Sequence, residues 1–292
     1  MENKDETQYL ELIKNILNEG TLEKGRNGNT ICLYGEKMKF NLRNNVLPLL
    51  TTKKVAWKTC LKELLWFISG NTNNKTLQDQ NVKIWNQNAS REFLDSVGLH
   101  DNQEGDLGPV YGHQWRHFNA TYTTCNDDYS GAGIDQLQNV INMLKDPAQR
   151  KSRRIILSAW NPCQLEMMAL PPCHSFVQFH VRGEDELICC LYQRSGDVGL
   201  GVPFNIASYS FLTHLLAKHC GLRATEFIHF IGNAHIYDDH IEALKTQLDN
   251  NILDFPTLSI KKIHDNIDNY SIDDFTVEDY KHADPVKMQM RS

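Results

Sequence analysis

The order of strand-like and helix-like segments limits the fold of this chain more than any other feature of its sequence. Two apolar runs, 175–181 and 187–193, flank the turn Arg182-Gly183-Glu184-Asp185 and predict a β-hairpin. Further strands are expected at 31–40, 154–160 and 227–231. Strands and helices mix without a regular strand–helix–strand repeat. We therefore expect an α+β fold with a large mixed β-sheet packed by helices.

Helical periodicity marks the segments that would cover this sheet. Asp5 and Gln8 have the spacing of a capping box and Gly20 follows the last apolar position, which predicts an N-terminal helix. Further helices are expected at 57–69, 134–145, 205–219 and 239–248. Residues 96–133 contain much Gly, Asp and Asn and predict a long loop or an insertion. The polar segment 265–292 either frays or folds back as a lid.

Length and composition favour one globular domain. The 292 residues contain no internal repeat and no obvious linker, so we expect a single domain over 1–292. Hydrophobic residues make up 41% and charged residues 23%, as in soluble globular proteins. The net charge of -6 argues against nucleic acid as the primary partner. An anionic ligand would therefore need a local cluster of arginines.

The sequence predicts neither a membrane span nor a disulfide framework. The longest apolar stretch, Leu64–Ile68, is far shorter than the roughly 20 residues that a span requires. The first residues lack the apolar core of a signal peptide. The eight cysteines are scattered without a CxxC pair, which is typical of a reducing compartment and not of a metal site. We expect no membrane, no metal, and a cytoplasmic or else nuclear location.

Cys173 is the candidate nucleophile among these cysteines. Pro171 and Pro172 fix the backbone ahead of it, and a strand is expected directly after it. The neighbouring His174 and nearby arginines would favour the thiolate form. The alternative is a buried, inert cysteine, which is the interpretation that suits the cysteines inside helices and strands.

Arginines at the ends of expected strands predict an anion site. Arg153 and Arg154 open one strand, and Arg194-Ser195-Gly196-Asp197 closes another. Guanidinium groups and a serine hydroxyl at such ends are suited to holding a phosphate, and Arg26 in its Gly-rich loop could join them. The alternative is a simple turn at 194–197 and ordinary surface arginines that make weak ion pairs.

Further polar residues lie at positions that suit a site. Burial inside helix 57–69 would raise the pKa of Glu63 and suit it to acid–base work, whereas an exposed side beside Lys62 is the alternative. Asn205 opens an expected helix, where an N-cap is the simplest interpretation. His235 and Tyr237 would face the same side of a strand, with a core histidine or a surface pair as the alternative.

Together, these residues and the motifs around them resemble the thymidylate synthase family. The resemblance runs from Tyr9 to about Leu248 and continues more weakly to the C-terminus. Residues 93–99 and 127–131 resemble the eukaryotic and viral branch of that family. The motifs are ELLWF at 63–67, GDLGPVYG at 105–112, MALPPCH at 168–174 and YQRSGDVGLGVPFNIASY at 192–209.

The resemblance implies a reaction and the residues that carry it. Deoxyuridylate (dUMP) would become thymidylate (dTMP), with 5,10-methylenetetrahydrofolate as one-carbon donor and reductant and dihydrofolate as the second product. Cys173 would attack carbon 6 of the pyrimidine, and Glu63 would transfer protons at the pyrimidine and the folate through ordered water. Tyr111 would be associated with removal of the carbon 5 proton. Arg194 would lower the pKa of Cys173 and bind phosphate.

The resemblance also implies how both substrates are held. Ser195, Arg26, Arg153 and Arg154 would join Arg194 at the phosphate, the last two donated across the interface of a homodimer. Asn205 would read the uracil edge. The other positions implied for dUMP are Gly196, Asp197, His235 and Tyr237, and those implied for folate are Ile84, Trp85, Asn88, Asp197, Leu200, Gly201, Phe204 and Arg291.

The chain departs from the family pattern at four places. The Arg26 loop is one residue shorter, which would affect its closure over the phosphate. Asn86 and Asn233 stand where the family has aspartate, which would alter proton or water networks. The sequence ends in Arg291-Ser292 where the family has a small apolar pair that closes over the folate.

Three other functions stay open as alternatives. A deoxyuridylate hydroxymethylase on the same scaffold would add water in place of hydride, although a bulky Trp85 wall would keep water away. A non-catalytic RNA-binding or regulatory protein is disfavoured by the net charge and by the intact set of Cys173, Glu63, Arg194 and Asn205. A cofactor-free cysteine hydrolase would need an Asp or Asn partner for a Cys173–His174 pair, and none is evident.

Overall fold

A six-stranded sheet forms the centre of the computed structural model, which describes residues 3–25 and 28–291. Its strand order is β1-β2-β6-β5-β4-β3. Neighbouring strands are antiparallel except β5 and β6, which are parallel, so the sheet is mixed and the expected α+β class is confirmed. The strands are β1 (Thr21–Gly25), β2 (Gly28–Asn41), β3 (Ile156–Ser158), β4 (His174–Arg182), β5 (Glu186–Asp197) and β6 (Arg223–Tyr237).

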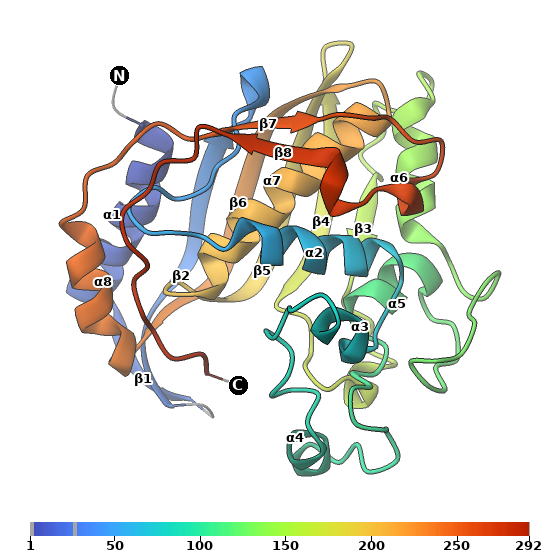
Figure 1. The fold of residues 1–292 in the computed structure, drawn as a ribbon, viewed down its shortest axis with the longest axis horizontal. Coiled ribbons are helices and arrows are strands. Elements are labelled where there is room, and N and C mark those ends of the chain that lie inside the picture. Colours follow the sequence, from blue (N-terminus) through green and yellow to red (C-terminus); the bar gives the residue numbers. More distant parts are fainter. Residues whose placement is uncertain (1–2, 26–27, 292) are drawn as a thin grey trace.

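Helices cover one face of this sheet, and α7 (Gly201–His219) lies across its centre (Figure 1). Nearly every side chain of α7 is buried, because the helix packs on β5 and β6 on one side and on α2 on the other. The other helices are α1 (Lys4–Glu19), α2 (Trp57–Ile68), α3 (Asn74–Gln78), α4 (Arg91–Ser96), α5 (Tyr111–His117), α6 (Gln136–Lys145) and α8 (Ile241–Leu248).

Short elements complete the described chain. A two-stranded sheet pairs β7 (Thr257–Ile260) with β8 (Phe275–Glu278). The 3-10 turns are η1 (Arg43–Asn45), η2 (Leu165–Met167), η3 (Asp238–His240), η4 (Ile267–Asn269) and η5 (Ile272–Asp274). Among the residues described, no helix is long and apolar enough to cross a membrane.

The predicted hairpin is confirmed, and the alternation of its buried and exposed side chains explains how it packs against the helices. Val177 pairs with Leu191 and Phe179 with Cys189, and all four side chains are buried on the helix-covered face. The buried residues of strands and helices form one contiguous core. A single domain over 1–292 stays a prediction.

Two helix starts differ from expectation. Asn3 caps α1, since its side chain accepts a hydrogen bond from the amide of Glu6. The predicted capping box is therefore wrong, and the Asp5 carboxylate instead accepts from the amide of Asn41 on β2. Helix α7 begins at Gly201, a turn before Asn205, so Asn205 is not its N-cap. Pro203 lies in the first turn, where its missing N–H costs nothing.

Two segments without a clear sequence pattern are ordered by contacts. The expected loop 96–133 contains α5. The C-terminal tail folds back over the molecule, and its end approaches the β1 hairpin (Figure 1). The amide of Ala283 donates to the carbonyl of Thr51 at 2.7 Å, and Arg291 Nη2 lies 2.8 Å from Asp239 Oδ2. The frayed alternative is therefore wrong for this segment up to residue 291.

Candidate active site

Parallel pairing of β5 and β6 brings two predicted groups of residues to one end of the sheet. Ser195 pairs with Asn233 and Asp197 with His235, so the end of each strand lies beside the other. A pocket of about 560 Å³ opens there. It is lined by Gly25, Gly28, Thr30, Leu170, Pro171, Arg194, Ser195, Asn233, His235 and Tyr237.

Two predicted phosphate ligands, Arg153 and Arg154, are not part of this lining. Arg153 and Arg154 precede the edge strand β3, which β4 separates from β5. Both are exposed, and neither forms an ion pair within the described part of the chain. The structure therefore does not bring them to the pocket of their own chain. Arg26 lies outside the described residues, although its neighbours Gly25 and Gly28 line the pocket.

Cys173 lies directly before β4 and beside Arg194, which lines this pocket, although Cys173 is not itself among the lining residues. Its Sγ is 3.7 Å from Nη2 of Arg194, and its amide donates to the hydroxyl of Tyr111 at 2.9 Å. The Arg194 guanidinium donates to the carbonyls of Pro171 and Pro172, at 2.8 Å each. The two prolines thus hold the arginine beside the sulfur, in addition to fixing the backbone.

The protonation of this group differs from expectation. Burial raises the pKa of the Cys173 thiol, and the positive charge of Arg194 offsets this effect in part. Burial also lowers the pKa of His174 to about 3, so its imidazole is neutral. That ring stacks on Tyr111 at 4.1 Å, and its Nδ1 hydrogen bonds to the Tyr209 hydroxyl at 2.7 Å. The prediction that His174 favours the thiolate is therefore wrong.

Glu63 lies on the inward side of α2, as one of the two interpretations predicted. Its carboxylate accepts a hydrogen bond from the indole nitrogen of Trp85 at 2.7 Å. Burial raises the pKa of Glu63 from 4.5 to about 7, and the bond from Trp85 opposes this shift. A carboxyl group with a pKa near neutrality can both give and take a proton under physiological conditions.

This pKa predicts a pH-dependent gain in stability for Glu63→Gln. Ionising Glu63 costs more in the folded protein than in the unfolded chain, so its charge lowers stability above pH 4.5 and most strongly above about pH 7. We expect the variant to raise the free energy of unfolding by about 1–3 kcal/mol at pH 8, with the gain disappearing near pH 4. Urea unfolding at both pH values measures it. Glu11→Gln, on the exposed side of α1, is the control, and equal gains in both variants would contradict the assignment.

The predicted folate walls come from two segments that both contact α2. Trp85 packs against Trp66 and Tyr111, at centroid distances of 6.5 and 6.2 Å. The Nδ2 of Asn88 is buried and has no hydrogen-bond partner among the described residues. The second predicted wall comes from the start of α7, where the carbonyl of Phe204 accepts a hydrogen bond from Cys60 of α2. Ile84 is adjacent to Trp85 in the sequence and is assigned to the first predicted wall. Leu200 and Gly201 lie at the start of α7 and are assigned to the second.

Residues where the chain departs from the family pattern make defined contacts. Asn233 Oδ1 lies 3.1 Å from Nδ1 of His235, so it can accept a hydrogen bond from a neutral imidazole without adding a negative charge. Asn86 Oδ1 accepts from the amides of Asn74 and Gln78, at 3.1 and 3.0 Å. Both asparagines therefore hold neighbouring side chains in place.

Several residues of the site were missed by sequence reasoning. Lys53 is buried beside Asp197, burial lowers its pKa to about 8, and its Nζ donates to the carbonyl of Gly199. Gln193 hydrogen bonds to Asn205, and His229 hydrogen bonds to Gln193. Two-residue alternation back from Ser195 could have found Gln193. Lys53 and His229 carry no comparable signal.

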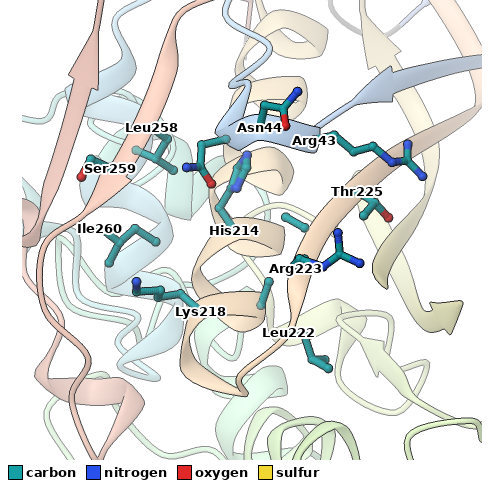
Figure 2. A pocket seen from close by; sticks show the side chains of 13 residues that line it. Arg43, Asn44, His214, Lys218, Leu222, Arg223, Thr225, Leu258, Ser259 and Ile260 are labelled. Carbon is teal, nitrogen blue, oxygen red and sulfur yellow. The ribbon is translucent and has the colours of Figure 1, made fainter. Parts of the chain in front are cut away.

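A second pocket, of about 460 Å³, lies at the other end of β6 and α7 (Figure 2). Its lining includes Arg43, Arg223 and the buried His214. The two arginines already pair with acids, Arg43 with Glu186 at 3.3 Å and Arg223 with Asp185 at 2.7 Å. None of the predicted site residues that the structure describes lines this pocket, so it is not the candidate active site.

The fold and the first pocket define a class of protein. It is an α+β protein with a cysteine beside Arg194, which lines a pocket, and with a buried carboxyl group whose pKa is near neutrality. Comparisons with known proteins specify the class further. A family model described as thymidylate synthase matches residues 7–292, and the chain belongs to the thymidylate synthase family.

Curated relatives match over nearly the whole chain. Thymidylate synthase of Saccharomyces cerevisiae is 51% identical over 99% of this chain and 97% of its own length. The probable thymidylate synthase of Schizosaccharomyces pombe is 52% identical over 99% of this chain and 48% of its own length. The bifunctional dihydrofolate reductase-thymidylate synthase 2 of Arabidopsis thaliana is 52% identical over 98% and 50%. This chain thus spans about half the length of the last two.

Proposed function

We propose that this protein is a thymidylate synthase that methylates dUMP to dTMP and converts 5,10-methylenetetrahydrofolate to dihydrofolate. The observation that carries the proposal is the placement of Cys173, whose Sγ lies 3.7 Å from Arg194, a residue that lines a pocket together with Ser195 and His235. Carbon 5 of uracil is a poor nucleophile. Addition of a thiolate at carbon 6 converts it to an enolate and so activates carbon 5.

The residues around Cys173 would assist this addition. Tyr111 remains protonated, because burial raises its pKa, and it accepts a hydrogen bond from the Cys173 amide, so it would orient the water that removes the carbon 5 proton without taking the proton itself. Glu63, with a pKa of about 7, would exchange protons at the pyrimidine and the folate. Release of tritium from carbon 5 of labelled dUMP tests this step. The account requires release that depends on Cys173.

The pocket would hold the nucleotide from its phosphate to its ribose. Arg194 and Ser195 would bind the phosphate with Arg26, and His235 and Tyr237 would bind the ribose hydroxyl. Gly196 permits this arrangement, because a Cβ there would lie 2.9 Å from Val202 Cγ2 at the start of α7.

The folate walls fit a planar ligand with polar edges. Trp85 and Phe204 offer apolar faces, and the amide of Asn88, whose Nδ2 has no partner among the residues described, offers a donor. Asp197, whose Oδ1 accepts from the amide of Gly199, would bind the pterin. The bound folate supplies the one-carbon unit and the hydride. Arg291 lies above the hairpin of Gly28, where it would hold the tail over the site.

Asn205→Asp is expected to shift preference from dUMP toward deoxycytidylate. Uracil presents a carbonyl and a ring N–H, which one amide can match with a donor and an acceptor. Cytosine presents an amino group and a bare nitrogen, which a protonated carboxyl group matches better. A mismatch of this kind costs about 1–3 kcal/mol, or one to two decades of discrimination. The ratio of kcat/KM for the two nucleotides measures it, and an unchanged ratio would remove Asn205 from this role.

The second face of the sheet supports the expected homodimer. It leaves Tyr192 exposed, at 40%, and Tyr192 stacks on Phe230 at 4.9 Å and packs edge-on against Phe176 at 5.4 Å. Exposed aromatic clusters on a sheet face are typical of protein interfaces. Arg153 and Arg154 lie at the edge of the same sheet, so each would reach the phosphate pocket of the other subunit.

Two further points follow from the same account. The eight free cysteines favour a cytoplasmic or nuclear location. The relatives' names favour the synthase over the hydroxymethylase, and so does the indole wall formed by Trp85, which would exclude water. Within the described residues, no group of His, Cys, Asp and Glu is arranged to hold a metal ion.

A further inference from the structure

Three polar side chains form a hydrogen-bonded chain from the sheet to the pyrimidine site. His229 Nε2 lies 2.7 Å from Gln193 Oε1. Gln193 Nε2 lies 3.0 Å from Asn205 Oδ1 and 2.8 Å from the backbone carbonyl of Ser195. This series of hydrogen bonds therefore joins β6, β5 and α7.

The backbone carbonyl of Ser195 sets the direction of this chain. A carbonyl oxygen only accepts hydrogen bonds, so the amide group of Gln193 that faces it must be the NH₂. The oxygen of Gln193 then faces His229. An oxygen requires a donor, so Nε2 of His229 must carry the proton in the neutral ring.

The same logic orients Asn205. The second N–H of Gln193 points at Asn205, so the atom of Asn205 that it meets must be the oxygen Oδ1. The Nδ2 group of Asn205 is then turned away from Gln193, and it has no partner in the part of the chain described. An outward N–H₂ with an oxygen behind it matches the carbonyl of uracil at carbon 4, and the reversed amide would match the amino group of cytosine.

The burial of His229 indicates that the hydrogen bond from its Nε2 to Gln193 is the reason for a histidine at this position. The side chain is fully buried, and its Nδ1 has no hydrogen-bond partner among the described residues. An unpaired buried acceptor costs stability, and an apolar side chain would avoid that cost. Burial also lowers the pKa of His229 to about 3, so the ring stays neutral and keeps a single N–H to donate.

We propose that His229 is a positioning residue for pyrimidine selection. By donating from Nε2 to Gln193 it fixes, together with the carbonyl of Ser195, the orientation of the Gln193 amide, and through it the orientation of the Asn205 amide. This proposal rests on the proposed function, in which Asn205 reads the pyrimidine. His229 itself does not touch the nucleotide.

His229→Phe tests the proposal. Without the donor, the Gln193 oxygen is unsatisfied, so Gln193 can rotate and the Asn205 amide can reverse. We expect the kcat/KM ratio of dUMP to deoxycytidylate to fall about fivefold to tenfold, mainly through a higher KM for dUMP and with kcat less affected. His229→Gln restores a donor and should recover most of the ratio. An unchanged ratio in His229→Phe overturns the proposal.

His214→Phe is the matched control. His214 is also buried, its Nε2 hydrogen bonds to the carbonyl of Val46, and burial lowers its pKa to about 4. It lies in α7, near the second pocket (Figure 2). We expect a comparable loss of stability with no change in the ratio. A fall in the ratio equal to that of His229→Phe would show a general structural effect and overturn the proposal.

Two further measurements separate the proposal from the function on which it rests. Imidazole ¹⁵N chemical shifts of the wild-type protein report the tautomer without any variant, and a proton on Nδ1 of His229 would overturn the proposal even if His229→Phe failed to fold. Asn205→Asp is measured on the same ratio. If it shifts the ratio and His229→Phe does not, only the role of His229 fails. If it has no effect, the assignment of Asn205 fails.

Discussion

Replacing Cys173 by serine should abolish turnover and leave dUMP binding almost unchanged. The two side chains have nearly the same shape, and the contacts of Arg194 with Pro171 and Pro172 do not involve the sulfur. A serine hydroxyl is a far weaker nucleophile than a thiol, and Arg194 cannot ionise it. We expect kcat to fall by at least about 10⁴-fold, as for the loss of other enzyme nucleophiles.

Two measurements and one control check this prediction. Single-turnover kinetics give the rate of the chemical step, and calorimetry gives the dissociation constant of dUMP. Cys163→Ser is the matched control, because Cys163 is an exposed thiol outside the pocket. Its turnover should equal that of the wild type. Near-normal turnover of Cys173→Ser would remove Cys173 from its role.

Mixing two inactive variants should restore activity if the sites are shared between subunits. A chain with Cys173→Ser keeps Arg154, and a chain with Arg154→Ala keeps Cys173. In a heterodimer, the chain with the intact cysteine receives the partner subunit's Arg154. Random exchange makes half of the dimers heterodimers with one complete site each, so a 1:1 mixture should reach about a quarter of wild-type turnover.

A second mixture is the control for this experiment. Cys173→Ser and Glu63→Gln change the same site of their own chain, so their heterodimer has no complete site and should stay inactive. Subunit exchange is verified by mass spectrometry of the mixed dimers. If exchange is complete and the first mixture stays as inactive as the second, each site is self-contained and the interface role of Arg154 is wrong.

Much of the fold could be predicted because its segments carry clear periodicity. The alternation at Val177, Phe179, Cys189 and Leu191 places the β4–β5 hairpin correctly. Strand β6 was recognised over 227–231 and in fact runs over 15 residues. Its later part carries polar side chains such as Asn233 and His235, which face the pocket and interrupt the apolar pattern.

The residues of the site could be predicted from the sequence where they lie at strand ends. They could not be predicted where tertiary contacts decide the role or the protonation of a side chain. Arg194 and His235 follow from strand pairing. The protonation of His174 does not, because Tyr111 and Tyr209 from distant segments bury it. Similarly, both Asn3 and Asp5 are suitable N-caps for α1, and the sequence does not decide between them. In the structure Asn3 caps the helix, because the Asp5 carboxylate accepts a hydrogen bond from Asn41 on β2.

A site shared between subunits would supply positive charges that a single chain does not bring to Cys173. Burial raises the pKa of Cys173, and Arg194 alone does not offset this effect. Further positive charges near the phosphate pocket would favour the thiolate. Arg26 and the partner subunit's arginines are the proposed source, which links the dimer to the chemistry of the nucleophile.

Identification of both products tests the central claim most directly. The protein is incubated with dUMP and 5,10-methylenetetrahydrofolate, and the nucleotide and folate products are separated and identified by mass spectrometry. Omitting either substrate and using Cys173→Ser serve as controls. We predict thymidylate and dihydrofolate in equal amounts. Hydroxymethyl-deoxyuridylate with tetrahydrofolate, or unchanged substrates with a folded wild-type protein, would contradict the account.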